Sequence, residues 1–256
     1  MEWQSGQATA RVDLEGGRLA SLCIDGLEIL VTEGSKPSRF GSFPMVPWCG
    51  RLAHGKLAHA GREHAFPLTS PPHANHGRGY LQAWEPLDER TIRTALSSPW
   101  PFGGECRQRF DLGPDSLTVT LSVHAADEPM PAMLGWHPWF LRQLARGGPA
   151  ALTFAAGKTY ATDEHQVPTG ELLPPPPGPW DHCFTDLQAG PSIHWPGALT
   201  LDISSDLDHW VIFTEPAHAL CVEPQSGPPN QSNRAPHIVL PGEALVGSMT
   251  LAWRNG

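Results

Sequence analysis

The chain has 256 residues, with 17 Lys and Arg against 26 Asp and Glu, a formal net charge of −9. This acidic balance, without a basic run, excludes a nucleic-acid partner, because phosphate binding relies on clustered Lys and Arg. The 28 Pro and 26 Gly disfavour long helices and favour short strands joined by turns.

Short apolar runs separated by turn residues recur along the chain. Strands are predicted over 8–14, 19–24, 27–32, 117–124, 199–204, 210–214, 219–222 and 245–253. The clearest is 117–123, which alternates strictly between apolar and polar residues, as a half-buried antiparallel strand does. No long segment shows the apolar stripe of an amphipathic helix. The sequence therefore predicts an all-β fold.

The Pro-rich stretch 173–179 is open to three interpretations: a linker between domains, a ligand for an SH3-type module, or a rigid surface loop. Strand patterns continue on both sides of it, and so do the candidate site residues described below. We therefore expect one domain over residues 1–256, with 173–179 as a surface loop.

Cysteine usage and hydropathy bear on the cellular compartment. The five Cys are odd in number, widely spaced and lack a C-x-x-C pair, so neither a disulfide framework nor a structural zinc site is expected. No apolar run approaches the roughly 18 residues of a membrane span. The first residues also lack the pattern of a signal peptide. We expect a cytoplasmic protein without a membrane partner.

Two segments carry polar residues in constrained turns. In 43–52, Arg51 follows an apolar run punctuated by Pro, and its planar guanidinium could grip neighbouring hydroxyls or pair with a carboxylate. In 75–79, His76 stands before Gly77 in a loop next to two Pro residues. Single loop histidines are mostly solvated bystanders, and His73 close by shows how common His is in this chain.

Two other segments bury a titratable residue in an apolar run. His137 lies within 134–140, where it is either a neutral core histidine or a proton donor and acceptor held near neutral pH. Glu223 directly follows an apolar strand and precedes Pro224, and a buried Glu needs a partner or serves as a tuned base. Asp181 is a weaker candidate of the same kind.

Taken in this order, these segments resemble the aldose 1-epimerase (galactose mutarotase) family over most of the chain. The matching segments are Pro47-Trp48-Cys49-Gly50-Arg51, His76-Gly77, the stretch from Gly135 to Phe140, the stretch from Asp181 to Phe184, Glu223-Pro224-Gln225, and Leu240-Pro241-Gly242-Glu243 before the last predicted strand. Each motif is weak alone, whereas the ordered set is specific.

The resemblance implies a single large antiparallel β-sandwich and a set of roles. Glu223 would be the general base that removes the proton of the anomeric hydroxyl, and His137 the general acid that protonates the ring oxygen. Arg51 and His76 would bind the ring oxygen and neighbouring hydroxyls, and Asp181 hydroxyls on the far side. The reaction needs neither a cofactor nor a metal. The expected partner is a monosaccharide, and the expected assembly a monomer or homodimer.

Two departures leave the substrate open. The family commonly has Asn before the Arg, where this chain has Gly50. Arg78 after His76-Gly77 would add positive charge beside the pocket and favour an acidic or phosphorylated sugar, unless it is simply solvated. Because no wider Lys or Arg cluster accompanies the motifs, a hexose-phosphate mutarotase ranks below a mutarotase of free aldoses. A non-catalytic sugar-binding protein on the same fold is a third reading, against which the presence of both Glu223 and His137 argues.

Overall fold

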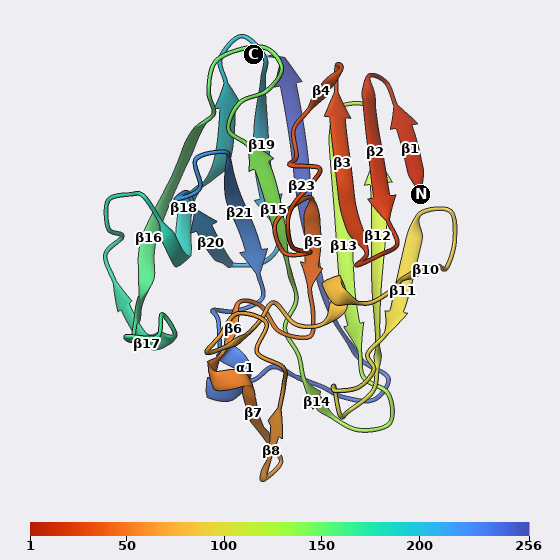
Figure 1. Ribbon diagram of the computed structural model, residues 1–256, viewed down its shortest axis with the longest axis vertical. Helices are drawn as coiled ribbons and strands as arrows, with labels where there is room; N and C mark the ends of the chain where they lie inside the picture. Colours follow the sequence, from red (N-terminus) through yellow and green to blue (C-terminus); the bar gives the residue numbers. More distant parts are fainter. Residues whose placement is uncertain (256) are drawn as a thin grey trace.

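β-strands make up nearly all of the regular structure in the computed structural model, which describes residues 1–255 (Figure 1). In the first half these are β1 (Glu2–Ser5), β2 (Ala8–Asp13), β3 (Arg18–Ile24), β4 (Leu27–Glu28), β5 (Ser42–Met45), β6 (Arg51–Leu52), β7 (Lys56–His59), β8 (Arg62–Ala65), β9 (Ala74–Asn75), β10 (Glu85–Pro86), β11 (Thr91–Ala95), β12 (Glu105–Leu112) and β13 (Ser116–His124). In the second half they are β14 (Met130–Pro131), β15 (Gly135–Leu141), β16 (Ala151–Thr162), β17 (Pro168–Leu173), β18 (Asp181–Trp195), β19 (Leu199–Ser205), β20 (His209–Phe213), β21 (Ala219–Gln225), β22 (Ile238–Val239) and β23 (Ala244–Asn255). The helical elements are α1 (Gln231–Arg234) and the 3-10 turns Ala53–Gly55 and Gly79–Leu81.

One sheet of 17 strands, paired antiparallel, curls over itself so that its two halves face each other across the core. In Figure 1 the red N-terminal strands β1 to β3 lie in front of β12 and β13. Trp3 of β1 stacks on Phe110 of β12 with ring centroids 5.5 Å apart, which marks contact between the two layers. The expectation of an all-β antiparallel sandwich is confirmed.

The strand β13 shows how the sequence pattern fixes the layers. Its apolar residues are buried and its polar ones half-exposed in strict alternation. It is hydrogen-bonded to β12 on one side and β23 on the other, so that Val119 lies opposite both Phe110 and Met249. Burial of one face of such a strand follows directly from the period of two.

Other strands differ from the sequence predictions. The predicted strand 27–32 pairs as a strand only over Leu27–Glu28, because the chain then turns so that Val31 N–H donates to the carbonyl of Trp139 on β15. Strands β16 and β18, which hold one edge of the sheet, were not predicted at all. The Pro-rich stretch joins β17 to β18, two strands of the same sheet, and is mostly exposed.

The five cysteines are free thiols, and four of them are buried. Among residues 1–255, the structure contains no helix that is both long and apolar enough to cross a membrane.

Candidate active site

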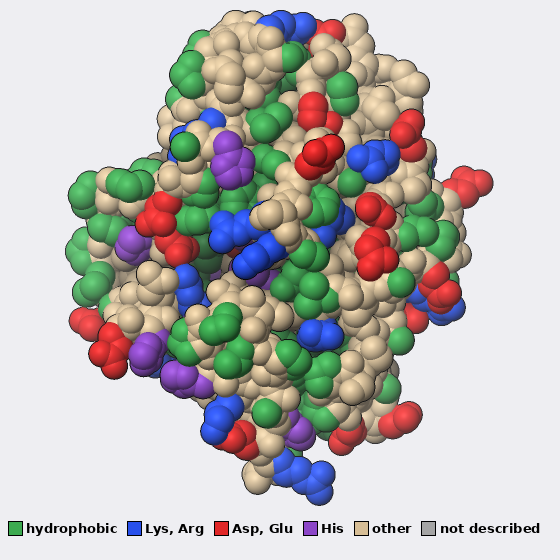
Figure 2. Space-filling model, in the orientation of Figure 1, with side chains coloured by type: hydrophobic (Ala, Val, Ile, Leu, Met, Phe, Trp, Pro, Cys, Tyr) green, Lys and Arg blue, Asp and Glu red, His purple; other side chains and the backbone are tan. Residues whose placement is uncertain are grey.

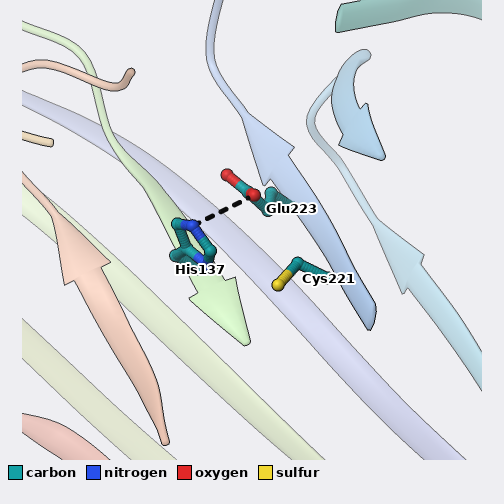
Figure 3. A group of neighbouring side chains, drawn as sticks. All are labelled: His137, Cys221 and Glu223. Carbon is teal, nitrogen blue, oxygen red and sulfur yellow. Dashed lines mark ion pairs between the residues drawn. The ribbon is translucent and has the colours of Figure 1, made fainter. Parts of the chain in front are cut away.

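The centre of the site is formed by two neighbouring strands, β15 and β21. Their register pairs Gly135 with Gln225 and Trp139 with Cys221, which places His137 opposite Glu223. Figure 3 shows the two side chains turned toward each other across this pair of strands. His137 Nε2 lies 3.3 Å from Glu223 Oε1, and the residues are only 5% and 2% exposed.

Aromatic rings fix the orientation of His137. Its imidazole lies between Phe43 of β5, at a centroid distance of 4.9 Å, and Trp139 of its own strand, at 5.2 Å. His76 adds an edge-on contact at 5.0 Å. A side chain packed between two rings keeps one rotamer, so Nε2 faces Glu223 without reorganisation.

Burial shifts the pKa values of this pair in opposite directions. Burial raises the pKa of Glu223 well above 4.5, and the nearby charge of Asp181 raises it further. Burial lowers the pKa of His137 well below 6.5, and His76 and Arg39 lower it further. Each group disfavours its own charged form, so burial favours the pair in which both residues are neutral, with the proton on Glu223.

Arg51 and Asp181 form the second charged pair of the site. Arg51 Nη2 lies 3.0 Å from Asp181 Oδ2 and donates to Gln166 Oε1 at 2.7 Å. Arg51 is on β6 and Asp181 at the first position of β18, so segments far apart in sequence meet here. Of the two readings of Arg51, the structure shows the carboxylate pair, and it also places both side chains on the wall of a cavity.

His76 is held in place rather than solvated. Asn75 Nδ2 lies 2.9 Å from His76 Nε2, and His76 Nδ1 contacts the sulfur of Met45. Burial, with the charges of Arg51 and Arg39, lowers the pKa of His76 to about 3, so its ring is neutral. Gly77 beside it has φ +71°, and a Cβ there would lie 2.0 Å from the carbonyl oxygen of Val46.

All five candidate residues line one cavity of about 280 Å³. Sequence reasoning missed several other lining residues: Lys36, Ser38, Arg39, Asn75, Gln166, Glu215 and Gln225. Gln225 belongs to the Glu-Pro-Gln segment and could have been found there. Arg78, expected beside the pocket, is not among the described residues that line the cavity; it directly precedes the Gly79–Leu81 turn.

Several buried polar atoms near this cavity have no protein partner. Within residues 1–255, Asn75 Oδ1, Gln225 Oε1 and His137 Nδ1 make no hydrogen bond. Buried acceptors are almost always satisfied in folded proteins. As the side chains stand, these atoms are closed off from the open cavity as well as from bulk solvent.

Gly50 also lines the cavity, and the structure explains why it carries no side chain. Its φ is +59°, and a Cβ would lie 2.6 Å from Cγ of Pro229. The place of the family's usual Asn side chain is therefore filled by the Pro229 ring, and the amides on the cavity wall come from Asn75 and the Gln side chains.

His137, Glu223 and Cys221 offer three ligand-type atoms within 4.8 Å of one another (Figure 3). Metal binding by a thiol requires its deprotonation. Burial raises the pKa of Cys221 well above 9.0, and Glu223 raises it further, so the thiol stays protonated. Cys221 packs beside the pair as a small, fully buried side chain.

The model of the family described as aldose 1-epimerase matches residues 1–252. This chain belongs to the aldose 1-epimerase family. Among curated proteins, none matches the chain significantly.

Solved structures show the same fold over nearly their whole length. A galactose mutarotase-like protein from Clostridium acetobutylicum superposes with a TM-score of 0.86 at 18% identity, covering 100% of this chain and 95% of that one. An aldose epimerase homologue from C. elegans gives 0.81 at 14% identity, with 100% and 98% covered. The galactose 1-epimerase from Lactobacillus acidophilus NCFM gives 0.78 at 15% identity, with 99% and 93% covered. At these identities the likeness establishes the fold, and the site must be argued from its own geometry.

Proposed function

We propose that this family member is an aldose 1-epimerase that interconverts the α and β anomers of a sugar by opening and reclosing its ring. The observation that carries the proposal is the His137–Glu223 pair, 3.3 Å apart and buried at the base of a cavity with room for a monosaccharide. The two oxygens that exchange protons in this reaction are bonded to the same carbon. A base and an acid this close together can serve both at once.

In ring opening, Glu223 takes the proton of the anomeric hydroxyl while His137 Nε2 delivers a proton to the ring oxygen. The bond between the anomeric carbon and the ring oxygen breaks, and an aldehyde forms. Rotation about the bond to that carbon turns its other face to the new hydroxyl. Ring closure then runs the two proton transfers in reverse and gives the other anomer.

The shifted pKa values favour the neutral pair, which is the form that recloses the ring. The charged form, Glu223 carboxylate with His137 imidazolium, receives the closed sugar, and ring opening leaves both residues neutral. Burial favours that neutral form, whereas Arg51 lowers the pKa of Glu223 and favours the carboxylate. Both forms contain one proton, so the cycle needs no exchange with solvent. Positioned proton transfer of this kind is worth roughly 10²–10⁴-fold in rate.

The remaining candidates take binding roles. The Arg51 guanidinium, already oriented by Asp181, has donors for oxygen atoms of the sugar, and a positive group there stabilises charge developing at the ring oxygen. Neutral His76, whose ring contacts that of His137, forms a hydrogen bond with the sugar beside its ring oxygen. Asp181, paired with Arg51 on the same wall, accepts from hydroxyls of the sugar.

The test is the rate of anomer interconversion, followed by polarimetry or exchange NMR with a panel of aldoses. Glu223→Gln and His137→Asn should each lose about 10²-fold or more in kcat while keeping the fold. Glu171→Gln and His237→Asn change the same residue types at exposed positions and should keep full activity. Full activity of Glu223→Gln or His137→Asn would refute the mechanism, and binding without turnover by the unchanged protein would indicate a non-catalytic sugar-binding protein.

A further inference from the structure

We propose that the cavity takes an aldose that carries an anionic group, a phosphate ester or a carboxylate, and that Lys36 and Arg39 bind this group at the cavity mouth. This inference rests on the proposed mutarotase function and adds the substrate class. From the sequence alone, a free aldose ranked above a phosphorylated sugar as the substrate, because no Lys or Arg cluster accompanied the motifs. The structure leads us to reverse that ranking.

The positive charge comes from the segment between β4 and β5. Lys36, Ser38 and Arg39 all line the cavity that holds Glu223 and His137. Figure 2 shows Lys and Arg side chains gathered in the middle of this face, over the region where β5 and β21 end in Figure 1. This clustering is unusual in a chain whose formal net charge is −9.

The two cations have no carboxylate partner. Among residues 1–255, neither Lys36 nor Arg39 forms an ion pair, although Glu215 also lines the cavity. Of the remaining charged lining residues, Arg51 and Asp181 neutralise each other at 3.0 Å, and Glu223 is buried 3.3 Å from His137, away from the exposed Lys36 and Arg39. The mouth therefore has an excess of positive charge that is free to meet an anion.

Hydrogen bonds to buried side chains and to β15 hold the segment between β4 and β5 in position. Trp139 Nε1 donates to the carbonyl of Ser38 at 3.1 Å, and Trp139 N–H donates to that of Gly41 at 2.9 Å. Buried Arg18 donates to the carbonyl of Phe40 at 2.6 Å, with its guanidinium 4.0 Å from the centre of the Phe40 ring. These contacts fix the backbone on either side of Arg39.

Trp139 links this segment to the acid–base pair. The Arg39 guanidinium carbon lies 5.5 Å from the centre of the Trp139 ring, and that ring stacks on His137 at 5.2 Å. A sugar with its anomeric carbon at His137 and Glu223 would extend along the same wall toward Arg39. An anionic group at the far end of the sugar is thus the feature that this mouth recognises, since guanidinium and ammonium donors form strong charge-assisted hydrogen bonds with phosphate and carboxylate.

The experiment compares kcat/KM for matched sugars after each uncatalysed rate is subtracted. The probes are glucose and galactose, their 6-phosphates, and glucuronate and galacturonate. Because a hydrogen bond to a charged group is worth a factor of about 10 or more, we expect a preference of at least about 10-fold for one anionic class. The preferred class identifies the group as phosphate or carboxylate. KM for the preferred sugar should also rise with ionic strength, whereas KM for the neutral sugar should not.

The double variant Lys36→Gln/Arg39→Gln should reduce the anionic-to-neutral ratio of kcat/KM by about 10-fold or more. The matched control Arg62→Gln/Lys158→Gln removes the same charge from exposed residues outside the cavity and should leave the ratio unchanged. Equal or faster turnover of neutral sugars, or a ratio that the Lys36 and Arg39 changes do not move, would overturn the proposal.

Failure of the mutarotase function itself gives a different result, namely no interconversion of any probe above its uncatalysed rate. Calorimetry then decides the inference separately. Tighter binding of glucose 6-phosphate or glucuronate than of glucose, lost in Lys36→Gln/Arg39→Gln, would still support an anion site at the mouth. Equal affinities would reject it.

Discussion

Replacement of Gly50 tests whether the Pro229 ring has taken the space that an Asn side chain would need. Gly50 combines φ +59° with a hypothetical Cβ that would lie 2.6 Å from Pro229 Cγ and 2.9 Å from its Cβ. Its carbonyl also accepts the His76 N–H at 2.9 Å, so a shift here reaches the site. Pro229 is buried and follows the strand that carries Glu223.

The cost of Gly50→Ala has two parts. A left-handed backbone costs a residue with a Cβ about 1–2 kcal/mol, and overlap with a packed neighbour costs about 1–3 kcal/mol. We therefore expect a loss near 3 kcal/mol in the free energy of unfolding, or about 9 °C in Tm at roughly 3 °C per kcal/mol for a chain of this size. Gly50→Asn should also lose about 3 kcal/mol, because Asn tolerates the left-handed region better but its longer side chain adds to the overlap with Pro229.

Urea unfolding of Gly50→Asn, Pro229→Ala and the double variant completes a double-mutant cycle. Pro229→Ala removes Cγ, the atom closest to the new side chain, so the double variant should be more stable than the sum of the single losses by about 1 kcal/mol. Strict additivity would show that Pro229 does not fill the space. Wild-type stability of Gly50→Ala would refute the argument from backbone and overlap together.

Three further predictions concern the charged pairs. Because folding raises the pKa of Glu223 above 4.5, the native state keeps a proton that the unfolded chain releases, and the contribution of Glu223 to stability is lost as pH rises above 4.5; the difference in unfolding free energy between wild type and Glu223→Gln should change with pH in that direction in urea unfolding, and parallel pH profiles would contradict it. Folding lowers the pKa of His137 below 6.5, so the contribution of His137 is lost as pH drops below 6.5, and the difference between wild type and His137→Asn should change in the opposite direction in the same measurement. Asp181→Asn frees Arg51 from a half-exposed pair, so it should cost less than about 1 kcal/mol of stability but raise KM more than it lowers kcat; a loss confined to kcat would argue for a direct role in proton transfer.

The fold class could be read from the sequence, whereas much of the pairing could not. Strand β13 could be predicted because its residues alternate between an apolar and a polar face along its whole length. Strand β16 could not be predicted in this way, because most of its residues are half-buried or exposed and many are Ala, Gly or Thr. Its place depends on pairing with β18, whose register includes irregularities that no local pattern encodes.

Only the site residues that combine burial with an ionisable group could be predicted from their own flanking residues. Glu223 stood out because burial of a carboxylate in an apolar strand costs free energy unless it has a partner. By its own flanking residues His137 fitted a structural role slightly better, and only the ordered motifs favoured catalysis. Lys36 and Arg39 could not be found, because polar residues in a loop without periodicity give no sign of which cavity they border.

The acid and the base stand on β15 and β21, which are neighbours in the sheet but distant in sequence. Arg51 and Asp181 come from still other parts of the chain. Closure of long loops must precede such contacts, and proteins rich in them fold slowly. Regain of activity during refolding should therefore lag behind the appearance of β-structure, so that catalysis itself reports the last strands to pair.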